Sequence, residues 1–171
     1  IDYKEFIDKE DCEVVYGIDW GYSNDPTAIV EVRRKNDRLY VNELLYKKNL
    51  TNQDIYNEIK NLDLLEEIFV CDSAEPKSIR EIRSYGHKIF PVTKGRDSVI
   101  YGINLINQNE IYVTSKSKNL IRELQGYVWD KDKEGNNVQK PTGIHPDCID
   151  AARYALMMQL ENPNRGKYAI R

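Results

Sequence analysis

The fold is decided by the stretch Val14-Val15-Tyr16-Gly17-Ile18-Asp19-Trp20-Gly21, in which a short apolar run ends in an aspartate. A turn-rich segment follows at residues 22–26, and apolar residues resume at 28–30. Short apolar runs bounded by turn residues are typical of buried strands. The stretch therefore predicts a strand that carries the Asp19 carboxylate to the edge of a sheet.

Two later parts of the chain repeat this placement of an acid at the end of a rigid element. Asp72 closes another short apolar run, and Asp147 and Asp150 open an apolar helical stretch. Carboxylates so placed repel one another unless cations intervene. Oxygen atoms are also the ligands that Mg²⁺ and Mn²⁺ prefer. Asp19, Asp72 and Asp150 are therefore predicted to form a metal site.

Asp147 allows two interpretations. It lies three residues before Asp150, so both carboxylates would face the same side of a helix, and Asp147 could be a metal ligand or orient a water molecule. It also follows Pro146 directly ahead of an apolar run, as a helix N-cap does. Both interpretations stay open, and Asp147 is kept as a fourth candidate site residue.

Strand-like and helix-like segments alternate along the chain. N-capping residues, a proline in a first turn and apolar residues at helical spacing indicate the helices, and β-branched and aromatic residues indicate the strands. A polar, turn-forming stretch predicts an added β-hairpin near 130–138. The expected strands are 14–19, 27–34, 38–46, 68–71, 87–91 and 110–113, and the expected helices are 51–62, 76–86, 97–108, one marked by Leu120, Leu124 and Val128, and 147–160.

Composition limits the classes of protein that the chain can be. Its 171 residues, 40% of them hydrophobic, suffice for one domain with a core, at 14–161, with an N-terminal extension at 1–13 and a flexible tail at 162–171. No apolar stretch is long enough to span a bilayer, and the chain opens on no basic leader or signal core, which predicts a cytosolic protein without membrane contact.

Charge and cysteine content add two restrictions. A net charge of −3 is unlike the lysine and arginine excess of proteins that hold nucleic acid mainly through phosphates, so the domain alone is expected to bind DNA weakly. The three cysteines are odd in number and show no pairwise metal spacing, so they are interpreted as reduced thiols.

The element order is that of the ribonuclease H-like fold, an α/β fold with a mixed central sheet. Its first three strands are antiparallel, its later strands are parallel, and helices flank it. Three motifs resemble the nuclease domain of tailed-phage terminase large subunits, over about 14–158. They are Gly17-Ile18-Asp19-Trp20-Gly21 with Asp25-Pro26-Thr27-Ala28, then Asp72-Ser73-Ala74-Glu75-Pro76-Lys77-Ser78, and finally Asp150-Ala151-Ala152-Arg153-Tyr154-Ala155.

This resemblance implies a DNA endonuclease that cuts double-stranded concatemeric viral DNA by two-metal hydrolysis of phosphodiester bonds. Its two divalent cations, Mg²⁺ or Mn²⁺, would be held by Asp19 as the shared ligand, by Asp72 and by Asp150, with Asp147 less certain. The implied partners are double-stranded DNA, the terminase ATPase domain, the portal protein and the small terminase subunit. The implied setting is the host cytoplasm, with the isolated domain monomeric.

Other classes remain to be compared. Resolvases and transposases share the fold and metal chemistry but differ in the residues around Glu75-Pro76 and Asp150-Ala151. The glycine-rich strand end at 17–21 also resembles the first phosphate loop of actin-like ATPases, yet no second such element follows, and no Gly-x-x-x-x-Gly-Lys-Ser/Thr loop occurs. A non-catalytic module of the same fold would be expected to lack the three acids.

Overall fold

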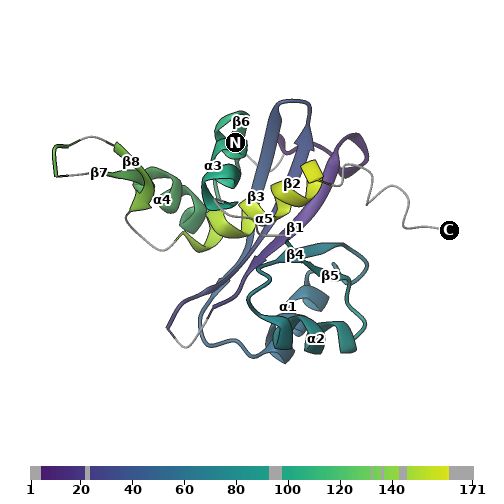
Figure 1. Ribbon diagram of the computed structural model, residues 1–171. Helices are drawn as coiled ribbons and strands as arrows, with labels where there is room; N and C mark the ends of the chain where they lie inside the picture. Colours follow the sequence, from purple (N-terminus) through teal and green to yellow (C-terminus); the bar gives the residue numbers. More distant parts are fainter. Residues whose placement is uncertain are drawn as a thin grey trace.

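The computed structural model describes residues 5–21, 24–92, 98–131, 133–135, 137–142 and 146–161. In these residues a mixed sheet of six strands, in the order β5-β4-β1-β2-β3-β6, lies beside a separate two-stranded sheet (Figure 1). The strands of the large sheet are β1 (Glu13–Asp19), β2 (Thr27–Lys35), β3 (Arg38–Lys47), β4 (Phe69–Cys71), β5 (Ile89–Pro91) and β6 (Glu110–Val113).

The strand directions are those of the predicted fold. β1, β2 and β3 are antiparallel neighbours, β4 and β5 run parallel to β1, and β6 runs parallel to β3 on the other edge. The tight turn between β2 and β3 has Asn36 at φ 53°, a left-handed conformation that asparagine tolerates better than most residues. The α/β class with a mixed, antiparallel-then-parallel sheet is confirmed.

Five helices lie among the described residues, and they pack on both faces of the sheet. One apolar cluster joins α1 and α2 to Tyr16 and Ile18 of β1, and the other joins α3, α4 and α5 to β2 and β3. Figure 1 shows α1 and α2 together near β4 and β5, and α5 crossing the long strands. The bounds are α1 (Asn52–Asn61), α2 (Pro76–Ser84), α3 (Ser98–Asn107), α4 (Lys118–Gly126) and α5 (Asp147–Glu161).

Local chemistry explains where two of these helices begin. Thr51 and Asp54 form a capping box at α1, in which the Thr51 hydroxyl accepts the Asp54 N–H and the Asp54 carboxylate accepts the Thr51 N–H. Pro76 occupies the first turn of α2, where its missing N–H costs nothing. Among the helices of the described residues, none is long and apolar enough to cross a membrane.

The predicted helix through Leu120, Leu124 and Val128 is wrong at its last residue. α4 ends at Gly126, Tyr127 is extended, and Val128 begins β7 (Val128–Lys131). A glycine favours the end of a helix, whereas spacing alone counted Val128 as a further helical turn. β7 pairs antiparallel with β8 (Asn137–Thr142), which confirms the added hairpin and extends it beyond 130–138.

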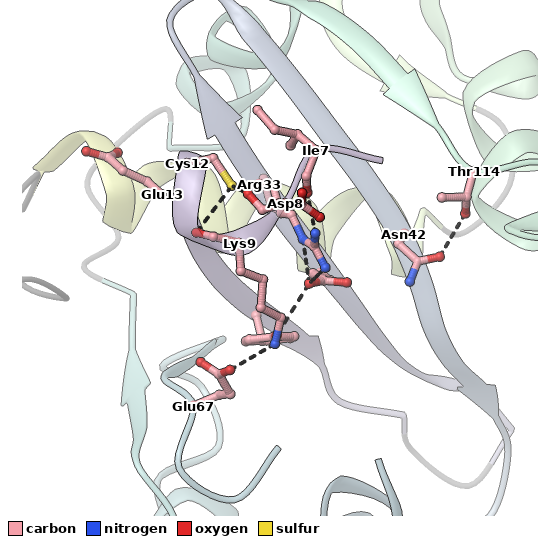
Figure 2. A network of polar contacts seen from close by, with 12 residues as sticks. Ile7, Asp8, Lys9, Cys12, Glu13, Arg33, Asn42, Glu67 and Thr114 are labelled. Atoms are coloured by element: carbon pink, nitrogen blue, oxygen red, sulfur yellow. Dashed lines mark hydrogen bonds and ion pairs between the residues drawn. The ribbon is translucent and has the colours of Figure 1, made fainter. Parts of the chain in front are cut away.

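The segment before β1 is fastened to β2 by Arg33, whose contacts are drawn in Figure 2. The buried Arg33 guanidinium donates to the Ile7 carbonyl, lies 4.5 Å from the centre of the Phe6 ring, and pairs with buried Glu31 at 2.7 Å. A buried arginine with a carboxylate partner and a carbonyl acceptor is satisfied, while removal of either partner would leave a costly buried charge. From Phe6 onward, this segment is therefore packed on the sheet.

Candidate active site

Two of the predicted site residues meet at one edge of the sheet. Asp19 is the last residue of β1, and Asp72 directly follows the last residue of β4. β1 and β4 pair in parallel with Ile18 opposite Cys71, so the two aspartates come next on strands about 4.8 Å apart. The parallel register therefore brings together two carboxylates that are far apart in sequence.

A close approach between α5 and β1 brings the acids of α5 to the same place. Gly17 lies against the backbone of Ala151, and a Cβ on Gly17 would overlap the Ala151 carbonyl group. Only glycine leaves room for the helix backbone at that point of the strand. Asp150, the residue before Ala151, is thereby placed beside the end of β1.

Electrostatic coupling shows that all four aspartates gather around Asp19. Burial, followed by the carboxylates of Asp150, Asp147 and Asp72, raises the pKa of Asp19 to about 8, while Arg153 acts in the opposite direction. An acid that is desolvated and surrounded by other acids favours a proton or another cation. The structure thus brings together the four residues predicted from the sequence.

Asp72 is held by a turn and by a tyrosine. One carboxylate oxygen accepts the Ala74 N–H at 2.8 Å, and the other accepts the Tyr154 hydroxyl at 3.4 Å. Tyr154 is buried, and burial followed by the charges of Asp19, Asp150 and Asp72 raises its pKa. Sequence reasoning missed Tyr154 as a site residue, although it lies four residues after Asp150 and so on the same helix face.

Asp150 is held by Arg153, a second residue that sequence reasoning missed. The Arg153 Nη2 and Nε atoms lie 2.9 and 3.3 Å from one Asp150 carboxylate oxygen, Oδ1. The Arg153 side chain is 2% exposed, and the Asp150 side chain is 24% exposed. The spacing of three residues on a helix was the available signal for this pair.

The N-cap interpretation of Asp147 is wrong by one position. The Pro146 carbonyl accepts the Asp150 N–H at 2.7 Å, so Pro146 is the cap residue and Asp147 is the first residue of α5. The Asp147 carboxylate accepts the Tyr46 hydroxyl at 3.1 Å instead. Its role as a metal ligand stays a prediction.

A buried glutamate from α4 satisfies the start of α5. Glu123 accepts the Ile149 N–H at 3.0 Å, and burial is the main reason that the pKa of Glu123 is raised to about 7. A carboxylate at the N-terminal end of a helix is favoured by the unpaired N–H groups and by the helix dipole. Glu123 thus connects α4 to the part of α5 that carries Asp147 and Asp150.

The side chains are not arranged as a finished metal cage. Within the ranges that the structure describes, no three histidine, cysteine, aspartate or glutamate side chains form a ready-made metal-binding group. Arg153, Tyr154 and Tyr46 each engage one carboxylate of the cluster. The donor set nevertheless fits Mg²⁺ or Mn²⁺, because carboxylate oxygens are grouped on rigid elements and burdened with mutual repulsion.

Neither histidine adds a described donor to the cluster. His87 is buried against Phe69, and its Nδ1 lies 3.1 Å from the Leu65 carbonyl oxygen. It lies just before β5, on the side of the sheet that packs against α1 and α2. His145 lies outside the described residues.

Comparison with known proteins identifies the family. The family described as Terminase RNAseH like domain matches residues 19–158, so the chain belongs to that family. Two curated relatives are the PBSX phage terminase large subunit of Bacillus subtilis (strain 168) and the terminase large subunit of Bacillus phage SPP1. They are 27% and 28% identical over 143 and 146 residues, or 82% and 81% of this chain. These alignments cover 33% and 34% of the two relatives, so the chain spans about a third of their length.

Solved structures show the same fold. The nuclease domain of the SPP1 large terminase, solved with bound Mn, has a TM-score of 0.78 and 24% identity, over 92% of this chain and 89% of that one. The nuclease domain of the P22 large terminase has a TM-score of 0.69 and 17% identity, over 91% and 85%. The nuclease of thermophilic phage G20c, solved with bound magnesium, has a TM-score of 0.64 and 18% identity, over 85% and 81%.

Proposed function

We propose that this chain is the metal-dependent endonuclease domain of a phage DNA-packaging terminase large subunit, which hydrolyses phosphodiester bonds of double-stranded concatemeric viral DNA. The observation that carries the proposal is the convergence of Asp19, Asp72, Asp147 and Asp150, with the Asp19 pKa raised to about 8, in a chain of the terminase ribonuclease H-like family. The family match favours this function over resolvases, transposases and actin-like ATPases.

The proposed cofactor is a pair of divalent cations, Mg²⁺ or Mn²⁺. Bound Mn in the SPP1 domain and bound magnesium in the G20c nuclease support the kind of ion, and the number of ions is part of the proposal. Such ions supply an activated water and stabilise the departing oxygen. Asp19, at the centre of the carboxylate cluster, would be the shared ligand, with Asp72 and Asp150 on either side and Asp147 as the candidate fourth.

The protein's own residues prepare this chemistry. Tyr154 and the Ala74 N–H orient Asp72, and Glu123 holds the first turn of α5. Rigid placement of the ligands reduces the reorganisation needed during the reaction. Each of these contacts lies at a strand end or in the first two turns of α5, so the cluster is built on the regular elements of the fold.

The wider context of the domain is also proposed. Double-stranded DNA is the substrate, and the terminase ATPase domain, the portal protein and the small terminase subunit are the partners, in the host cytoplasm. A longer large terminase, from another thermophilic bacteriophage, supports the ATPase partner, because this chain matches 44% of that protein with a TM-score of 0.68. The division into 1–13, 14–161 and 162–171, and the monomeric state, stay predictions.

Cleavage of supercoiled plasmid by the purified domain tests the function. We expect nicked and linear products with Mn²⁺ or Mg²⁺ and none with EDTA. Ca²⁺ is expected to bind without supporting cleavage, because its looser and larger coordination suits an in-line displacement less well than Mg²⁺. Metal-independent cleavage would contradict the proposed mechanism, and the absence of both cleavage and metal binding in a folded domain would contradict the function.

Replacing Gly17 with alanine is expected to displace α5 and to lower both stability and cleavage. The added methyl group overlaps the Ala151 carbonyl group, and overpacking of this kind costs about 1–3 kcal/mol of unfolding free energy. Urea denaturation and the plasmid assay measure the two effects. Gly86→Ala is the matched control: Gly86 has φ 94° and open space around it, so the variant should lose stability while cleavage is retained. Full activity in Gly17→Ala would show that the α5 approach does not position the site.

A further inference from the structure

Arg153 is a buried cation inside the carboxylate cluster. Two of its guanidinium nitrogens, Nη2 and Nε, donate to the same Asp150 oxygen, Oδ1, at 2.9 and 3.3 Å. The guanidinium therefore engages one side of the Asp150 carboxylate and leaves Oδ2 to other partners. Charge-assisted contacts of this kind fix the direction of a carboxylate as well as its charge.

Arg153 is itself held by α3. Its aliphatic stem runs over Gly102, where a Cβ would overlap the Arg153 Cγ and Cδ atoms. Its Nη1 atom lies 3.4 Å from the Ser98 carbonyl oxygen, and its guanidinium carbon lies 5.0 Å from the centre of the Tyr154 ring. The glycine on α3 thus makes the space through which an arginine on α5 reaches an aspartate of the same helix.

From this geometry we infer that Arg153, seated on Gly102, is a positioning residue that orients Asp150 to receive a divalent cation through Oδ2. The inference rests on the proposed function, because it takes Asp150 as a ligand. A carboxylate that is oriented by an outer partner needs less rearrangement when the ion binds, and loss of such a partner typically weakens metal binding about 10- to 100-fold.

A competing role for Arg153 predicts the opposite result. A positive charge near the cluster repels an incoming cation, and Arg153 lowers the pKa of Asp19 through that same charge. If repulsion dominated, removing the guanidinium would tighten metal binding. The sign of the change in affinity therefore separates positioning from competition.

The test is the affinity of the 171-residue chain for Mn²⁺, measured by isothermal titration calorimetry in the absence of DNA. We expect Arg153→Met to weaken binding about 10- to 100-fold, and Gly102→Ala to weaken it in the same direction, because it displaces an unaltered Arg153. Arg153→Lys retains the charge but not the planar guanidinium, and it should also bind Mn²⁺ more weakly than the unaltered chain. Arg38→Met is the control, since Arg38 is 59% exposed and pairs with Glu110 away from the cluster.

Gly102→Ala protects the test against misfolding. Alanine favours a helix over glycine, so a loss of Mn²⁺ affinity in this variant with an intact circular dichroism spectrum cannot come from a weakened α3. Unchanged or tighter Mn²⁺ binding in Arg153→Met and Gly102→Ala would overturn the inference and leave the proposed function standing. Wild-type affinity in Arg153→Lys would show that charge alone matters and would also overturn it. Absence of Mn²⁺ binding to the unaltered chain would remove both the metal site and the inference.

Discussion

Asp19→Asn is expected to abolish metal-dependent DNA cleavage while leaving the fold intact. Asp19 is the aspartate whose pKa responds to all three others, so it is the one best placed to contact both proposed ions. Metal ions contribute several kcal/mol to the stabilisation of the transition state, and their loss should lower the cleavage rate about a thousandfold or more. The plasmid assay measures the rate, and calorimetry with Mn²⁺ measures binding.

Asp63→Asn is the matched control for this prediction. Asp63 is exposed, and its φ of 58° is one that asparagine also accepts, so the same chemical change should be silent there. Asp63 lies in the connection that enters β4, whereas Asp72 follows the opposite end of that strand. A folded Asp19→Asn variant that still cuts DNA at the unaltered rate would refute the assignment of Asp19.

In the presence of EDTA, the unaltered domain is expected to lose stability as the pH rises from about 4 to about 8. The pKa of Asp19 is raised to about 8 in the folded chain from an ordinary value of 3.8. The folded state therefore binds more protons than the unfolded state in this range, and its unfolding free energy falls as the pH increases. The expected loss is on the order of a few kcal/mol, since one pKa unit corresponds to about 1.4 kcal/mol.

Asp19→Asn should remove most of this pH dependence. The variant carries no ionisable group at that position, so it should be more stable than the unaltered chain near pH 8 and similar to it near pH 4. A smaller slope should remain, because the pKa of Glu123 is also raised, to about 7. Urea denaturation at several pH values in EDTA measures the difference, and parallel profiles for the two proteins would contradict the prediction.

Saturating Mn²⁺ should reverse the order of stability in the same experiment. An ion that binds only the folded state stabilises it by about 2.7 kcal/mol at a hundred times its dissociation constant. The unaltered chain should gain this stability near neutral pH, and Asp19→Asn should gain little. Equal stabilisation of both proteins would indicate that Mn²⁺ binds elsewhere.

The predicted strands and the acids at their ends came from local patterns. Apolar runs that end in an aspartate, at Asp19 and Asp72, needed no knowledge of distant residues, and the order of the elements was enough to predict the mixed sheet. The capping residues at Thr51 and the proline at Pro76 act within a few residues of themselves, so they are visible in sequence. Val128 was misassigned because helical spacing continued past Gly126, where the backbone becomes extended.

The contacts that hold the aspartates could not be predicted in this way. Tyr46 and Asp147 are 101 positions apart, and Glu123 and Ile149 are 26 positions apart, so only the packed structure shows that they meet. The same holds for Gly17 under Ala151, where the need for glycine comes from a helix on the other side of a strand–helix interface.

The sequence by itself determined the class of fold and which acids converge, because strand directions and hydrophobic periodicity set the sheet edge at which they emerge. The tertiary structure alone decided how each acid is held: Asp150 by Arg153, Asp72 by Tyr154, and Asp147 by Tyr46. The physical reason is that backbone pairing repeats along the chain and leaves a pattern in it. The orientation of a buried side chain, in contrast, depends on neighbours that packing brings together from distant elements.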